Sequence, residues 1–87
     1  LPSTEQRAAI FARYAKQLPP ESVHALAEAS HGLSGRNILD VCKATERRWA
    51  CSCIREGVNP KDAGLPTREC YVEVIQQSQH FGGGQKQ

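Results

Sequence analysis

Apolar residues recur every three or four positions in four segments of the chain, and no segment shows the strict alternation of a half-buried strand. The longest segment begins at Ser34 and continues to about Arg55. Its apolar stripe consists of Ile38, Val41, Cys42, Thr45, Trp49 and Cys53. Residues at these spacings lie on one side of a helix and face the core, so the pattern predicts an all-α fold, a small four-helix bundle.

The first helix has both a start signal and a stop signal. Ser3 and Gln6 have the spacing of a capping box, which predicts a helix from about Thr4 to Gln17. Pro19 and the proline after it end this helix, because proline disfavours helical conformation in the residue before it. The predicted inward stripe contains Ile10, Phe11, Tyr14, Ala15 and Leu18.

The second helix is predicted to begin near Pro20, since proline is well tolerated in the first turn of a helix. Val23, Leu26 and Ala27 recur at helical spacing and are expected to be buried. Gly32 is the expected stop, because glycine is common just past the end of a helix.

The last helical segment follows a loop, which is predicted over residues 57–66 because this stretch contains two glycines and two prolines. Thr67 is the expected cap of a fourth helix that ends near Gln79. Its inward residues are Tyr71, Val74 and Ile75. Residues 80–87 are Gly-rich and polar, which predicts a flexible, disordered C-terminal tail after a helical domain over residues 1–79.

Length and charge limit the classes of protein to which the chain can belong. With 87 residues it is one domain by length, and its formal net charge of +2 lacks the clustered excess of Lys and Arg that is typical of nucleic-acid-binding domains. No apolar run approaches the roughly 20 residues that span a bilayer, and the start of the chain has no signal-peptide pattern. We therefore expect no membrane partner and no nucleic-acid partner.

The four cysteines indicate an intracellular, reducing compartment. Cys42 and Cys53 belong to the apolar stripe and no secretory signal precedes them, so free thiols are expected rather than disulfides. Cys51 and Cys53 point roughly 200° apart on a helix, and the 3 histidines show no zinc-ligand spacing, so no metal site is predicted. No motif frames a catalytic nucleophile and its base.

The third helix is locally basic, but its Lys and Arg residues are mixed with Asp40 and Glu46 around a long core helix. A helix-turn-helix domain instead places a short recognition helix after a tight turn. We therefore expect a solvated face with Asp40–Lys43 and Lys43–Glu46 ion pairs, or a contact with a neighbouring domain.

Arg36 is unusual because it occupies the start of a helix, where the partly positive dipole favours acidic residues. Ser34 is the expected N-cap, and Gly35 lies between the two. Free backbone N–H groups, a glycine that lets a ligand approach and a guanidinium together form an anion site suited to phosphate. On local physics alone, an exposed arginine that costs a few tenths of a kcal/mol against the dipole is an equally good interpretation.

Two stretches of the chain resemble the C-terminal helical lid subdomain of AAA+ ATPases, namely LPSTEQRAAIFARYAKQL and LAEASHGLSGRNILDVCKATERRWA. In that family a Leu-Pro leads from the α/β nucleotide-binding subdomain into an Arg-containing first helix, and a segment of the form L-A-x-x-[ST]-x-G-[YLF]-S-G opens the third helix. The resemblance covers about Leu1 to Gln77 and is most specific over Leu26–Ile38. Together with the absence of Met and the abrupt start at Leu1, it leads us to expect a piece of a larger protein.

The resemblance implies a function for the start of the third helix. In these ATPases that position faces the nucleotide held by the larger subdomain, and many members have there an arginine, called sensor 2, that reaches the terminal phosphate. Arg36 falls at the sensor 2 position, and the resemblance places Ser34 and the Gly35 backbone beside the nucleotide. It also matches Tyr14 to a first-helix residue that lines the adenine pocket.

The phosphate loop, the acidic motif that binds magnesium and the trans-acting arginine of this family all belong to the large subdomain. The isolated fragment is therefore not expected to be catalytic, whereas the parent protein is expected to be an ATP hydrolase. The implied role is a lid that closes over ATP, senses its phosphates and passes motion between subunits. The implied partners are the large α/β subdomain of the same chain and the neighbouring subunits of a homo-oligomeric ring.

A free-standing helical adaptor, which binds a protein partner through the basic third helix, is the alternative function. The complete gene distinguishes the two, because a lid follows a phosphate loop and its acidic partner motif, whereas an adaptor has its own start. A small helical DNA-binding domain is a third hypothesis, and salt-dependent retardation of a DNA duplex would support it.

Overall fold

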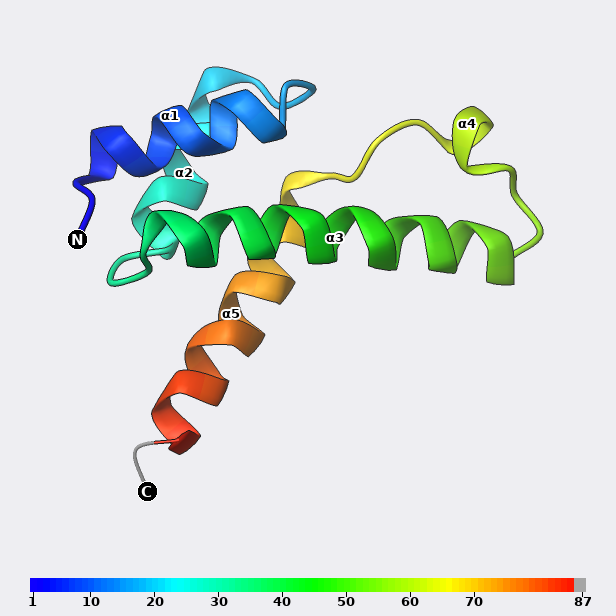
Figure 1. The fold of residues 1–87 in the computed structure, drawn as a ribbon. Coiled ribbons are helices and arrows are strands. Elements are labelled where there is room, and N and C mark those ends of the chain that lie inside the picture. Colours follow the sequence, from blue (N-terminus) through cyan, green and yellow to red (C-terminus); the bar gives the residue numbers. More distant parts are fainter. Residues whose placement is uncertain (86–87) are drawn as a thin grey trace.

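The computed structural model describes the backbone of residues 1–85 and the side chains of residues 1–59 and 61–78. Within this part of the chain there are five helices and no strand, which confirms the predicted all-α fold (Figure 1). The helices are α1 Thr4–Tyr14, α2 Pro20–Ala29, α3 Gly35–Arg55, α4 Pro60–Ala63 and α5 Arg68–Gln85. The four predicted helices correspond to α1, α2, α3 and α5, and the short α4 lies inside the predicted loop.

Helix α1 begins where the sequence predicts but ends earlier. The Ser3 hydroxyl accepts a hydrogen bond from the Gln6 backbone N–H at 3.2 Å, and the Gln6 side chain accepts one from the Ser3 N–H at 2.8 Å, so the capping box is confirmed. The predicted end at Gln17 is wrong, because Ala15 leaves the helical conformation with φ −115° and ψ 58°. The turn after Ala15 carries Leu18 back onto the core, and the Leu18 N–H donates to the Ala15 carbonyl at 3.1 Å.

Helix α2 begins at Pro20 and buries Val23, Leu26 and Ala27, all as predicted. It ends at Ala29, and the turn that follows passes through the left-handed region at Gly32, where φ is +90°. Glycine adopts this conformation at little cost because it has no Cβ. The predicted stop residue is therefore part of the turn that reverses the chain and sets the start of α3 beside α1.

Helix α3 is the longest element, with 21 residues. It packs against α1, α4 and α5. Its N-terminal half crosses the bundle, and its C-terminal end projects beyond the other long helices together with the loop that carries α4 (Figure 1). Among the predicted stripe residues, the buried ones are Ile38, Val41, Cys42, Thr45 and Cys53.

The core draws side chains from α1, α2, α3 and α5. Tyr71 is fully buried, and its hydroxyl accepts a hydrogen bond from the Gln17 side-chain amide at 3.1 Å. The same amide donates to the Pro66 carbonyl at 3.0 Å. Gln17 therefore joins the turn between α1 and α2 to the start of α5. The main core cluster is Phe11, Ala15, Val23, Leu26, Ile38, Val41, Cys42, Tyr71, Val74 and Ile75.

Trp49 is the exception to the predicted core stripe of α3. Its indole is only partly buried, and its Nε1 donates to the Gly64 carbonyl at 3.3 Å. The residues that share a pocket with it include Gly64, Leu65 and Pro66. A loop rather than a helix therefore covers the indole, and the prediction that Trp49 belongs to the core stripe is wrong.

We expect Trp49→Ala to lower the free energy of unfolding by about 1–2 kcal/mol, which is less than the roughly 3–5 kcal/mol typical of a fully buried tryptophan. Part of the indole remains in water, so less apolar surface is lost. Urea denaturation followed by circular dichroism measures the change, and Trp49→Phe, which keeps a ring but loses the hydrogen bond, should cost less. A loss above roughly 3 kcal/mol for Trp49→Ala would place the indole in the core after all.

The loop between α3 and α5 and the end of α5 both contain more helix than the sequence predicts. Asn59 caps α4, since its side chain accepts a hydrogen bond from the Lys61 N–H at 3.0 Å. Helix α5 continues to Gln85 rather than ending near Gln79. The earlier end is predicted because glycine costs about 1 kcal/mol relative to alanine in a helix. No proline follows Pro66, however, so no residue sterically blocks helical backbone in this segment.

The last two residues of the predicted tail lie outside the described residues. Within the described residues, no helix combines the length and the apolar character needed to cross a bilayer.

Candidate functional site

The predicted phosphate-contacting residues form the first turn of α3. The Ser34 hydroxyl accepts a hydrogen bond from the Asn37 N–H at 3.1 Å, and the Asn37 side-chain oxygen accepts one from the Ser34 N–H at 3.2 Å. This is a capping box with Asn in place of the usual Glu or Gln. It fixes the direction of the first turn and satisfies two donors, while the N–H groups of Gly35 and Arg36 have no acceptor inside the helix.

The Arg36 side chain extends into solvent and is 83% exposed. Its Nε lies 3.9 Å from Oδ1 of Asp40, one turn later, which is itself 62% exposed. An exposed pair at this spacing contributes about 0.3–0.5 kcal/mol, and it offsets the unfavourable placement of a cation at the positive end of the helix. So weak a contact leaves the guanidinium free to turn towards an anion.

Gly35 lies beside α1, and the fold does not require a glycine at this position. A Cβ added at Gly35 would lie 3.5 Å from the Cδ1 of Ile10, which is an ordinary van der Waals contact. The backbone φ of Gly35 is not positive either. Since neither packing nor backbone conformation demands glycine here, the missing side chain leaves the first turn of α3 open to the close approach of a ligand.

Tyr14 lies at the C-terminal end of α1 and is 39% exposed, so the prediction that it belongs to the inward stripe of this helix is wrong. The guanidinium carbon of Arg13 is 5.8 Å from the centroid of its ring. On α1 it follows Ile10 by one turn, and the structure places Ile10, not Tyr14, against Gly35. The role of Tyr14 in an adenine pocket stays a prediction. Ile10 is the residue of α1 that lies next to the candidate site at Gly35. The sequence does not identify it as a site residue, although it belongs to the predicted inward stripe of the first helix.

The two ion pairs predicted for Lys43 are wrong. Asp40 pairs with Arg36 instead. The two residues are four positions apart, so they lie on the same face of α3 and their side chains can meet. In the described part of the chain, neither Lys43 nor Arg47 forms an ion pair. The pairs that do form are His24–Glu28, Arg36–Asp40, Arg48–Glu73 and Arg68–Glu69.

Arg7 is a buried residue that the hydrophobic pattern does not reveal, with 4% of its surface exposed. Its guanidinium donates through Nε to the Ala27 carbonyl at 2.8 Å and through Nη1 to the Pro2 carbonyl at 2.8 Å. Nη2 donates to the Thr4 hydroxyl at 3.2 Å. Ala27 lies in the last turn of α2, where the negative end of the helix dipole stabilises a cation. Arg7 therefore fixes the residues that lead into α1 against the end of α2.

One signal in the sequence could have identified Arg7. It precedes the core residue Phe11 by four positions, so the two share one side of α1. An arginine on the apolar side of a helix indicates either a buried hydrogen-bond network or an interface.

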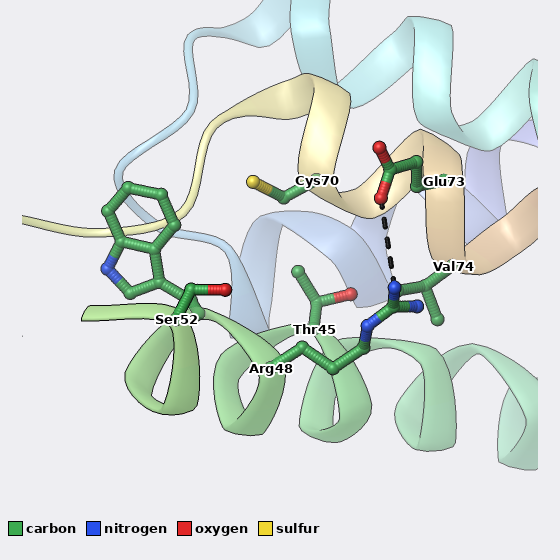
Figure 2. A pocket seen from close by; sticks show the side chains of 7 residues that line it. Thr45, Arg48, Ser52, Cys70, Glu73 and Val74 are labelled. Atoms are coloured by element: carbon green, nitrogen blue, oxygen red, sulfur yellow. Dashed lines mark ion pairs between the residues drawn. The ribbon is translucent and has the colours of Figure 1, made fainter. Parts of the chain in front are cut away.

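A small pocket between α3 and α5 is the second candidate site (Figure 2). It has a volume of about 100 Å³ and is lined by Thr45, Arg48, Trp49, Ser52, Cys70, Glu73 and Val74. Arg48 lies 3.8 Å from Glu73 and donates to the Gln77 side chain at 2.6 Å. The Thr45 hydroxyl donates to the Val41 carbonyl at 2.7 Å. Because the Arg48, Glu73 and Thr45 side chains already have protein partners and the volume suits only a few water molecules, the pocket is a packing gap between crossing helices.

The cysteines do not form a disulfide or a metal site in the described part of the chain. All four are free thiols, of which Cys42 and Cys53 are buried, Cys51 is exposed and Cys70 is partly buried. Among the described residues, no group of three or more His, Cys, Asp or Glu side chains is arranged to hold a metal ion.

The start of α3 is therefore the best candidate site. Two backbone N–H groups, the open backbone at Gly35 and the exposed guanidinium of Arg36 lie in one helical turn, and these groups have the chemistry that suits phosphate or another anion. Comparison of the chain with protein-family models, with curated proteins and with solved structures found no match.

Proposed function

We propose that the chain is the helical lid subdomain of an AAA+ ATPase and that Arg36 contacts the terminal phosphate of ATP. One observation carries this proposal: the Arg36 guanidinium is exposed at the positive end of α3, beside Gly35, and among the described residues its one ion-pair partner is Asp40. The resemblance of the Leu26–Ile38 segment to the lid of these ATPases supports the same position.

Three features of the first turn of α3 would act on the phosphate. The free N–H groups of Gly35 and Arg36 and the helix dipole attract negative charge, and a guanidinium can bind two phosphate oxygens at once. Breaking the exposed contact with Asp40 costs only about 0.3–0.5 kcal/mol, so phosphate displaces the carboxylate readily. Before nucleotide binds, Arg36 therefore keeps its weak contact with Asp40, and on binding it exchanges this contact for one with phosphate.

Apart from Tyr14, the remaining parts of the proposed nucleotide site lie outside this chain. ATP and its magnesium ion are bound mainly by a large α/β subdomain of the same polypeptide, and Tyr14 lines the adenine side. The chain alone is therefore not catalytic, and the parent protein is an ATP hydrolase.

The four free thiols accord with an intracellular, reducing compartment.

The structure of α3 suggests how the lid would relay motion in such a protein. A helix of 21 residues is about 30 Å long, and its N-terminal half is fixed in the core by Ile38, Val41 and Cys42. A small rotation of the bundle about its phosphate contact therefore moves the projecting end of α3 through a larger distance. In the proposal, that end or its neighbours contact the next subunit of a ring.

Arg36→Ala in the full-length protein is expected to lower the rate of ATP turnover roughly 10- to 100-fold, the effect of losing one charged hydrogen-bonded contact of about 1.5–3 kcal/mol. The same change in the 87-residue chain should leave the melting temperature almost unaltered, because the Arg36–Asp40 pair is exposed. Steady-state ATP hydrolysis and thermal denaturation by circular dichroism are the two measurements.

Two neighbouring variants serve as matched controls. Asp40→Asn removes the ion pair but keeps the guanidinium, so turnover should stay near that of the unmodified protein. Gly35→Ala should leave the fold intact, since its Cβ meets only Ile10, yet it should weaken nucleotide binding by crowding the backbone. A large drop in melting temperature for Arg36→Ala would make the arginine structural, and a complete polypeptide without a phosphate loop would contradict the lid function.

A further inference from the structure

Helix α3 has an exposed face opposite its core stripe. Residues 43, 47, 50 and 54 follow one another at spacings of four, three and four, so they lie on one side of the helix. We call Lys43, Arg47, Ala50 and Ile54 the outer face of α3. Lys43, Arg47 and Ile54 are exposed and Ala50 is partly exposed. The outer face is about 17 Å long and repeats after seven residues, as the seam of a coiled coil does.

The charge of the chain is concentrated on this helix. Helix α3 carries five of the 11 Lys and Arg residues and two of the 9 Asp and Glu residues, so its net charge is +3 while the rest of the chain has a net charge of −1. Arg36 and Arg48 bind Asp40 and Glu73. Lys43 and Arg47, one turn apart, have no such partner in the described part of the chain, and two like charges at this spacing repel each other.

The outer face changes from cationic to apolar along the helix axis. Ile54 is 67% exposed, and Val58 just beyond the helix is 40% exposed. Between the charges and this apolar end lies Ala50, a small residue that allows another helix to approach closely. A phosphate backbone would favour cations along the whole length, and a membrane surface would favour a broad apolar face. One narrow row with a charged half and an apolar half fits a helix of a protein.

We infer that the outer face of α3 is a docking surface for an acidic amphipathic helix of another protein. Acidic side chains one turn apart on that helix lie opposite Lys43 and Arg47, and an apolar side chain packs on Ala50 and Ile54. The charges set the register and the choice of partner, and the apolar contact adds affinity. The surface contains neither Arg36 nor any other residue of the proposed nucleotide contact, so its test does not depend on ATP binding.

A synthetic helical peptide tests this inference with the 87-residue chain, isotopically labelled for NMR. The peptide has a heptad stripe of two glutamates followed by alanine and leucine, and the control peptide has the same composition in scrambled order. We expect saturable binding of the first peptide only, with the largest amide shifts between Lys43 and Ile54. Binding should weaken as salt rises, because exposed charges are screened within about 10 Å at 0.1 M salt.

Charge reversal at the outer face provides the decisive comparison. The double variant Lys43→Glu, Arg47→Glu should lower the affinity for the acidic peptide at least roughly tenfold. It should also bind a peptide that has lysine in place of glutamate, which the unmodified chain does not bind. Arg13→Glu with Lys16→Glu changes two exposed cations on and beside α1, so it alters the net charge equally, and it should change affinity less than roughly threefold. Lys43→Gln with Arg47→Gln repeats the test without added negative charge, in case the reversed variant folds poorly.

Three results would overturn the inference. The first is the absence of saturable binding up to about 1 mM peptide, an affinity equivalent to only about 4 kcal/mol. The second is an equal loss of affinity in the Arg13 and Lys16 variant, which would show a general effect of net charge. The third is tighter binding of duplex DNA or of phosphatidylserine vesicles than of the peptide, lost in the same Lys43 and Arg47 variant, which would assign the face to a different class of partner.

Discussion

Replacing Arg7 with alanine is expected to lower the free energy of unfolding by about 3 kcal/mol, because Arg7 is the one charged residue that is buried in the described part of the chain. The change removes a buried guanidinium that donates to the carbonyls of Ala27 and Pro2 and to the Thr4 hydroxyl. Hydrogen bonds that involve a charged group contribute more than neutral ones, and the alanine leaves a cavity between α1 and α2 as well. Urea denaturation followed by circular dichroism measures the loss.

Companion variants separate the contributions of charge, shape and hydrogen bonding at Arg7. Arg7→Lys keeps the charge but has one nitrogen, which cannot reach acceptors at three different positions, so most of the loss should remain. Arg7→Met fills the volume without any donor and should recover only the packing part. Arg13→Ala, an exposed arginine on the same helix, should cost less than about 0.5 kcal/mol. A loss below roughly 1 kcal/mol for Arg7→Ala would mean that water replaces these hydrogen bonds easily.

A change at Arg7 is also expected to affect function, because Arg7 binds the carbonyl of Pro2, which lies just before α1. Arg7 holds the residues before α1 against α2, and the proposed large subdomain would connect through those residues. An Arg7 variant that still folds should therefore loosen the junction between the two subdomains. In the full-length protein this would weaken the coupling between ATP turnover and lid motion more than it weakens ATP binding itself.

Periodicity predicted the helices well because helix formation in this chain follows from burying one stripe of each segment. The starts of α1 and α3 were predictable from Ser3 and Ser34, whose caps depend on residues three positions away. The early end of α1 was not, since Ala15 leaves the helix to let Leu18 reach the core, and that gain depends on where the other helices lie. Trp49 was misplaced for the same reason, because the loop that covers it comes from another part of the chain.

The candidate site was predictable only in part. Ser34, Gly35 and Arg36 are consecutive, so local helix geometry alone brings them together. The neighbour of Gly35 on α1, which is Ile10, depends on the register between two helices, and no local sequence pattern gives that register. Arg7 was missed because two of its three acceptors are main-chain carbonyls, which every residue has and which no sequence pattern distinguishes.

Stability is expected to fall steeply in alkaline solution, and Cys42 is the main cause. Burial raises the pKa of the Cys42 thiol from its ordinary value of 9.0 to about 12, and the carboxylate of Glu46 contributes further. Burial also raises the pKa of the Tyr71 hydroxyl, against the opposing effect of its hydrogen bond from Gln17. Both groups are therefore kept neutral in the folded chain at a pH where they ionise in the unfolded chain.

The direction of the effect follows from proton binding. Between pH 9 and 12 the unfolded chain has released the Cys42 proton while the folded chain retains it, so each increase in pH favours the unfolded chain. The slope approaches about 1.4 kcal/mol per pH unit, which amounts to a loss of about 2 kcal/mol by pH 10.5 and about 4 kcal/mol by pH 12. Below pH 9 this contribution to stability is fully present.

Cys42→Ala should remove most of this alkaline loss, although it costs about 1 kcal/mol at neutral pH through the lost packing of the sulfur. The measurement is urea denaturation in a reducing buffer at intervals from pH 7.5 to pH 10.5, and the quantity compared is the slope of unfolding free energy against pH. Cys51→Ala, an exposed thiol on the same helix, should keep the slope of the unmodified chain. If the Cys42 and Cys51 variants lose stability in parallel, the buried thiol is not the group whose titration unfolds the chain.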